Sequence, residues 1–112
     1  MSYKFLSNIN NFDDFSDADK AYITPEINEE INFTDANNIN QEANFLMIRA
    51  HESNDLLIQI LPYNYGVFIP AGELWSVDSL SNLQGLTVKK AFSAGTSTSI
   101  NNPKVQWMIG YK

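Results

Sequence analysis

The chain has 112 residues, 44% of them hydrophobic, which fits one folded domain and excludes a chain that is disordered throughout. It contains no cysteine, which excludes disulfides, thiolate metal sites and cysteine nucleophiles. The net charge of −6 is uneven: residues 1–55 hold eleven acidic and three basic residues, a net of −8, whereas residues 56–112 carry +2.

The charge distribution also limits the partners. An acidic front half argues against nucleic acids and anionic membranes, because both attract clustered lysine and arginine. The opposite signs of the two halves are compatible with ordinary solvated charge or with docking between copies of the chain. No apolar run approaches the roughly 20 residues that cross a bilayer. The first residues, Met1–Leu6, lack the apolar stretch of a signal peptide, so we expect synthesis and folding in a cytoplasm.

The front segment, residues 1–43, is rich in Asn and Asp, which favour turns over helix or strand interiors. We expect an irregular arm with one or two short strands, for which Tyr22–Thr24 and Ile31–Thr34 are candidates. Residues Ser16–Ala21 are compatible with a single helical turn capped by Ser16. Such a polar arm commonly becomes ordered only against a partner.

From residue 44 onward the pattern is that of β-strands. Phe45–His51 alternates between two faces, and Leu56–Leu61 does so again after the polar turn at residues 52–55. Two alternating runs joined by a short polar connection predict a β-hairpin. A second turn follows at residues 62–66.

Further strands are predicted at Val67–Ile69, Leu86–Phe92 and Lys104–Lys112, whereas Leu74–Val77 is expected only to continue the chain after the turn at residues 71–73. The last strand has the clearest period of two, with Val105, Trp107, Ile109 and Tyr111 on one face. This makes five strands in residues 44–112, besides those of the arm. The sequence therefore predicts an all-β fold, a small antiparallel β-sandwich or barrel-like (jelly-roll-like) body at 44–112 with an irregular N-terminal arm at 1–43.

Residues for catalysis are scarce. The one histidine, His51, is expected at the surface, and it lacks the companions that a zinc site or a catalytic triad needs. The adjacent carboxylate pairs, Asp13–Asp14 and Glu29–Glu30, lie in the front segment, where nothing holds them at a fixed separation. We therefore expect no enzyme, no catalytic residue and no cofactor. Residues 13–19 offer oxygen ligands for calcium but lack the glycine and the closing glutamate of an EF-hand, so a solvated acidic loop is the simpler interpretation.

The aromatic residues divide into core and contact candidates. Trp75 and Trp107 are expected to fill the core of a small sandwich. Tyr63 and Tyr65 lie in a turn, where they are candidates for a protein interface or for a sugar-stacking surface. Phe12 and Phe15 in the arm are further candidates for a protein interface.

Three stretches carry a resemblance to a known group of proteins: Pro62–Trp75 with its Ile-Pro-Ala-Gly-Glu turn, Leu83–Val88 with a glycine before a Leu-x-Val strand, and the closing Val105–Tyr111 with Trp-x-x-x-Tyr. Together they resemble the small β-sandwich structural proteins of tailed-bacteriophage virions. The likeness covers roughly residues 45–112.

The resemblance implies a non-enzymatic virion component, present in many copies, that binds a repeating capsid lattice as a head decoration or auxiliary capsid protein. A tail or baseplate accessory protein is the alternative, and a carbohydrate-binding module of a receptor-binding appendage is another. In each case the expected location is the virion, without a signal peptide. The expected partners are other virion proteins and further copies of the chain, with no nucleic acid and no membrane.

Overall fold

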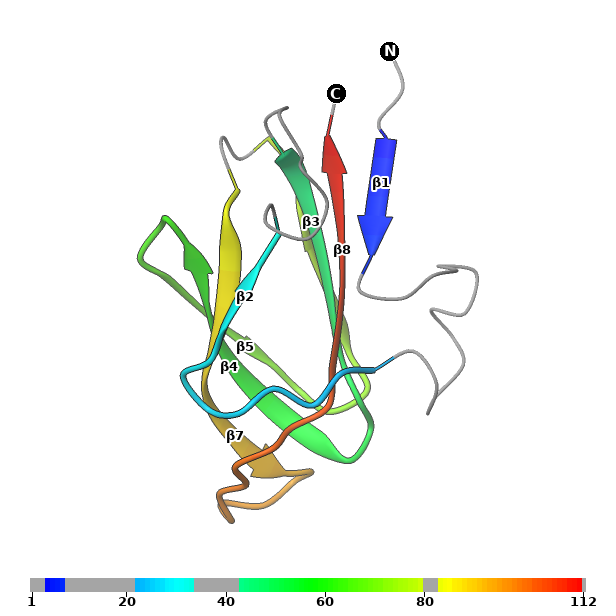
Figure 1. The fold of residues 1–112 in the computed structure, drawn as a ribbon. Coiled ribbons are helices and arrows are strands. Elements are labelled where there is room, and N and C mark those ends of the chain that lie inside the picture. Colours follow the sequence, from blue (N-terminus) through cyan, green and yellow to red (C-terminus); the bar gives the residue numbers. More distant parts are fainter. Residues whose placement is uncertain (1–3, 8–21, 34–42, 80–82, 112) are drawn as a thin grey trace.

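A computed structural model describes residues 4–7, 22–33, 43–79 and 83–111, and within these ranges the chain forms strands and no helix (Figure 1). The eight strands are β1 (Lys4–Ser7), β2 (Glu30–Asn32), β3 (Ala43–Ala50), β4 (Asn54–Leu61), β5 (Tyr65–Ile69), β6 (Leu74–Val77), β7 (Gly85–Ser93) and β8 (Val105–Tyr111).

The strands form two four-stranded sheets, one in the order β1-β8-β3-β6 and the other in the order β2-β7-β4-β5. Every neighbouring pair is antiparallel, including β1 and β8, which join opposite ends of the chain (Figure 1). The hairpin β4–β5 is the one connection between consecutive strands that stays within a sheet. Two facing four-stranded sheets with this order make a jelly roll. The predicted all-β sandwich is therefore confirmed.

The predicted hairpin at residues 45–61 is wrong. Strands β3 and β4 lie in different sheets, and the chain crosses from one to the other at residues 51–53. The inward residues of both strands are fully buried in one core, which is the same alternation that a hairpin would show. The partners decide between the two arrangements: β3 pairs with β6 and β8, whereas β4 pairs with β5 and β7.

The core lies between the two sheets and follows the predicted period of two. In β3 and β4 the inward positions are buried and alternate with outward ones, whereas in β8 the outward Gln106 is fully buried as well. Trp107 is in this core as predicted, whereas Trp75 on β6 is only partly buried against it. Strand β6 is a sixth strand in the region where five were expected. The fully buried inward residues of β3, β4, β7 and β8 are Leu46, Ile48, Ala50, Leu56, Ile58, Ile60, Leu86, Val88, Val105 and Ile109.

Two parts of the front segment take part in the sandwich. Strand β2 confirms the strand expected near Ile31, and Phe33 beyond it is fully buried, with its ring centroid 4.6 Å from that of Trp107. The stretch expected as a strand at Tyr22–Thr24 forms a single bridge, in which Ile23 and Val105 exchange backbone hydrogen bonds of 3.0 Å. The sequence did not predict β1. The suggested helical turn at Ser16–Ala21 lies outside the described residues.

Candidate functional site

The β4–β5 hairpin presents the tyrosines that the sequence singled out. Its turn contains Pro62, after a cis peptide bond, and Asn64, whose side-chain oxygen accepts a 3.4 Å hydrogen bond from Gln59. The rings of Tyr63 and Tyr65 stack, with centroids 5.5 Å apart and planes at 26°. Tyr63 packs partly against the core, whereas Tyr65 is 51% exposed. Of the two stacked rings, that of Tyr65 is therefore the more exposed.

Strand β5 adds a second exposed aromatic ring that sequence reasoning missed. Phe68 is 55% exposed and lies opposite the half-buried Leu57 on the outer face of the sheet. Tyr65 lies opposite the buried Ile60, so its side chain leaves β5 on the other face. The signal for Phe68 was present in the sequence, because Val67 and Ile69 take the inward positions and leave Phe68 outward.

Strands β5 and β6 are the edges of their two sheets, and a four-residue turn at 70–73 connects them. The third large exposed apolar residue, Leu74, is 50% exposed at the start of β6, opposite Arg49. We name β5 and β6 with their exposed residues Tyr65, Phe68 and Leu74 the aromatic edge. An edge strand offers unpaired backbone groups, and exposed apolar side chains beside them favour the addition of a partner chain.

His51 was expected at the surface, but this prediction is wrong, because its side chain is buried and only 7% exposed. Its ring meets that of Tyr22 edge-on, with centroids 4.9 Å apart. Its Nδ1 accepts a hydrogen bond from the backbone N–H of Ser53 and lies 2.8 Å from the hydroxyl of the same residue. Both contacts close the turn between β3 and β4. Because the nearby serine lies two residues away and its N–H occupies Nδ1, the arrangement is suited to holding the turn.

Most of the other sequence-predicted candidates belong to a part of the chain that the structure does not describe. Phe12, Phe15, the pair Asp13–Asp14 and the possible calcium loop at 13–19 lie outside the described residues. Of the second carboxylate pair, Glu29 accepts a 2.9 Å hydrogen bond from the backbone N–H of Glu26 and so stabilises a turn. In the described ranges, no three His, Asp or Glu side chains form a group that could hold a metal ion.

Among the titratable groups of the described residues, the Tyr22 hydroxyl has a pKa that is clearly shifted from its ordinary value. Burial raises the pKa of the Tyr22 hydroxyl above its ordinary value of 10.0, Arg49 opposes the rise and Glu52 adds to it. A neutral hydroxyl of this kind donates and accepts hydrogen bonds but supplies no base at neutral pH. Tyr22 is packed here against the ring of His51, so its role in this part of the structure is one of packing.

No protein-family model matches the chain, and a search of curated proteins returned no match. The described residues contain no helix with the length and apolar character needed to cross a membrane. The class of the protein therefore rests on its own fold: a small jelly roll with an exposed aromatic edge.

Proposed function

We propose that this protein is a non-enzymatic structural component of a tailed-bacteriophage virion, which binds a repeating capsid lattice as an oligomeric head decoration or auxiliary capsid protein. The observation that carries the proposal is the aromatic edge, where three large apolar residues at least half exposed lie on two open edge strands. Aromatic anchors on an interface contribute most of its binding energy.

The fold and the sequence support the same role. Jelly rolls serve in viral capsids and in lectins, although a fold by itself does not fix a function. The stretches that resemble phage structural proteins include β5, β8 and the first two residues of β6, so they contain all three exposed residues of the aromatic edge. A partner strand added to β5 would contact Tyr65 on one face and Phe68 on the other.

Co-sedimentation of the purified protein with assembled heads and with isolated tails, both from the phage that encodes it, tests the proposal. We expect the protein to sediment with heads, and the double variant Tyr65→Ser/Phe68→Ser to bind at least about tenfold more weakly because it loses two apolar anchors. Thr98→Ala, an exposed change in the loop before β8, serves as the matched control. Binding to tails alone would support the tail or baseplate alternative. A protein that stays monomeric and binds neither particle would overturn the proposal.

A second candidate, the carbohydrate-binding module, is favoured by the stacked Tyr63–Tyr65 pair with Asn64 between them. Sugars stack on exposed aromatic faces, and amide side chains beside such faces bind hydroxyl groups. Glycan-array binding that disappears in Tyr65→Ala and persists in Phe68→Ala would favour this candidate. An array without any bound glycan would eliminate it.

A further inference from the structure

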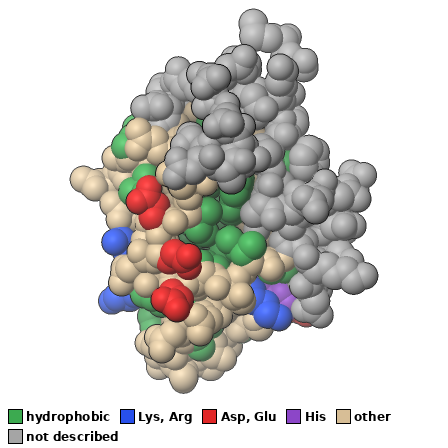
Figure 2. Space-filling view, in the orientation of Figure 1, with side chains coloured by type: hydrophobic (Ala, Val, Ile, Leu, Met, Phe, Trp, Pro, Cys, Tyr) green, Lys and Arg blue, Asp and Glu red, His purple; other side chains and the backbone are tan. Residues whose placement is uncertain are grey.

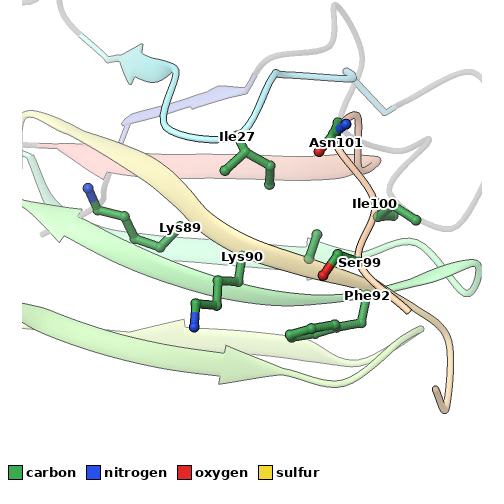
Figure 3. A pocket seen from close by; sticks show the side chains of 8 residues that line it. Ile27, Lys89, Lys90, Phe92, Ser99, Ile100 and Asn101 are labelled. Atoms are coloured by element: carbon green, nitrogen blue, oxygen red, sulfur yellow. The ribbon is translucent and has the colours of Figure 1, made fainter. Parts of the chain in front are cut away.

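A groove lies along β7, near the edge of the sheet that is opposite to the edge formed by β5. One edge of β7 pairs with β4, and the other edge, beyond its short pairing with β2, accepts backbone hydrogen bonds at two places. At one, the N–H of Asn28 donates to the carbonyl of Val88 at 2.9 Å, next to β2. At the other, the N–H of Ile100 donates to the carbonyl of Ala91 at 3.0 Å. Between them opens a cavity of about 290 Å³ that Lys89 and Lys90 help to line (Figure 3).

A β-bulge gives this groove two lysines where a regular strand would give one. Leu57 pairs with Lys90 and Ile58 with Val88, so Lys89 is an extra residue on β7. Lys89 and Lys90 are consequently both exposed. Bulges redirect side chains in this way near functional sites. The sequence pattern, which assumes strict alternation, did not reveal this pair.

The walls of the groove are apolar and held in place by hydrogen bonds. Figure 3 shows Ile27 pointing from its segment toward β7, with Phe92 and Ile100 further along the groove. The N–H of Ile27 donates to the carbonyl of Asn101 at 3.2 Å, which fastens one wall to the other. A site of this kind is largely preformed, so little ordering is lost when a ligand binds.

The groove continues into a second hollow of about 420 Å³, which shares Ile27 and Asn101 with the first and is also lined by Glu26. Lys89 and Lys90 therefore line the first hollow and Glu26 lines the second, while Glu30 of β2 lies opposite Thr87, two residues before Lys89. The structure shows no ion pair of Lys89 or Lys90 with another described residue. On the side drawn in Figure 2, acidic and basic side chains lie close together.

We propose that this groove binds an extended segment of a partner protein. The segment places an acidic side chain at Lys89 and Lys90, an apolar side chain over Ile27 and Phe92, and a basic or amide side chain beside Glu26. The smaller cavity lies at the lower limit of small-molecule sites, which suits one or two side chains.

The acidic residues around Lys89 and Lys90 favour a peptide over a polyanion as the ligand of this groove. A nucleic acid or an acidic polysaccharide in the groove would meet carboxylates on both sides of the lysines, at Glu26 and at the exposed Glu30, which lies opposite Thr87 on β7. The net charge of −6 adds to that repulsion. A peptide with opposite charges at its two ends meets both ends favourably. The groove is separate from the aromatic edge, so the two proposals stand or fall independently.

The test is a titration of the ¹⁵N-labelled full chain, followed by NMR chemical shifts. The probes are acetyl-Asp-Leu-Ser-Lys-amide, two versions with one residue more or fewer between the charges, and the uncharged acetyl-Asn-Leu-Ser-Gln-amide. We expect shifts confined to amides lining the groove, with at least one charged peptide binding more tightly than the uncharged one. The double variant Lys89→Gln/Lys90→Gln is expected to bind that peptide about tenfold more weakly. The control Lys104→Gln, which lies outside the groove, is expected to leave the affinity for the peptide unchanged.

A charge reversal makes the test specific. Glu26→Lys is expected to reverse the preference, so that acetyl-Asp-Leu-Ser-Asp-amide binds more tightly than acetyl-Asp-Leu-Ser-Lys-amide. A hexathymidylate and an oligogalacturonate complete the probes. The proposal is overturned if no charged peptide shifts the groove amides, if the lysine variant binds as the wild type does, or if either polyanion binds more tightly than the peptides.

Discussion

Gly85 is the residue whose lack of a side chain the fold requires most directly. It begins β7 opposite Asn32 of β2, and a Cβ atom at this position would collide with the backbone carbonyl oxygen of Ile31. The sequence showed a glycine before a Leu-x-Val strand, but the reason for it is the close approach of β2, which lies more than fifty residues earlier.

We therefore predict that Gly85→Ala lowers the free energy of unfolding by about 1–3 kcal/mol, because β2 must shift to make room. Urea denaturation measures the change. The matched control is Gly66→Ala on β5, where nothing lies within 4 Å of the added atom. That variant should be neutral or slightly stabilising. Equal losses in the two variants would contradict this account of Gly85.

Tyr22 gives the stability a dependence on alkaline pH. Because burial raises its pKa in the folded state above the ordinary 10.0, the folded chain retains the hydroxyl proton to higher pH than the unfolded chain. Its contribution is constant well below pH 10 and is lost as the pH rises through that value toward the folded pKa. Urea denaturation at about pH 8 and about pH 11 should show a smaller loss of stability for Tyr22→Phe than for the wild type. Tyr65→Phe is the control, and the prediction fails if it reduces the loss as much.

At the scale of elements, Asn54 shows how β4 is tied to the chain that enters β8. Its buried side chain donates to the carbonyl of Lys104 at 3.1 Å and accepts from the N–H of the same residue at 2.8 Å. The sequence placed Asn54 in a polar turn. Its role was not predictable because its partner lies fifty positions away.

We predict that Asn54→Ala costs about 1–3 kcal/mol of stability, since both side-chain hydrogen bonds to the backbone of Lys104 are lost. Asn64→Ala, at an exposed asparagine of the β4–β5 turn, should change stability by less than about 0.5 kcal/mol. Both values come from urea denaturation. A loss for Asn54→Ala no larger than for Asn64→Ala would show that this tie contributes little.

The elements themselves were largely predictable, and their partners were not. The period of two placed β3, β4, β5, β7 and β8 within a few residues of their observed bounds. The same alternation was misread as a hairpin at β3 and β4, because period two tells which face of a strand is buried but not which strand lies beside it. The β-bulge at Lys89 was hidden for the same reason.

The candidate site was predictable in part. Tyr65 is exposed, as a tyrosine in a turn should be, whereas Tyr63 is partly covered by its contact with the core. Phe68 could have been found from strict alternation along β5. Leu74 could not, because its exposure depends on β6 being the edge of a sheet. The contact role of Tyr63, Tyr65, Phe12 and Phe15 stays a prediction.

At the scale of the whole molecule, both sheets contribute to one hydrophobic core. All but one of the connections between consecutive strands pass from sheet to sheet, so neither sheet has a core of its own. We predict a single cooperative unfolding transition in urea, with coincident midpoints by tryptophan fluorescence and by far-ultraviolet circular dichroism. Trp75 and Trp107, on β6 and β8, report on one sheet, whereas circular dichroism reports on both. Separate midpoints would mean that the two sheets unfold independently.

The sequence by itself determined the β class, the inward faces of most strands and the scarcity of catalytic residues, because alternation and composition are local properties of the chain. Only the tertiary structure decided the jelly-roll order, the burial of His51 and Asn54, the open edges at β5 and β6 and the groove along β7. Each of these depends on pairing between distant segments, such as β1 with β8. Side-chain alternation is satisfied by many such pairings, and the joint packing of both sheets over one core selects among them.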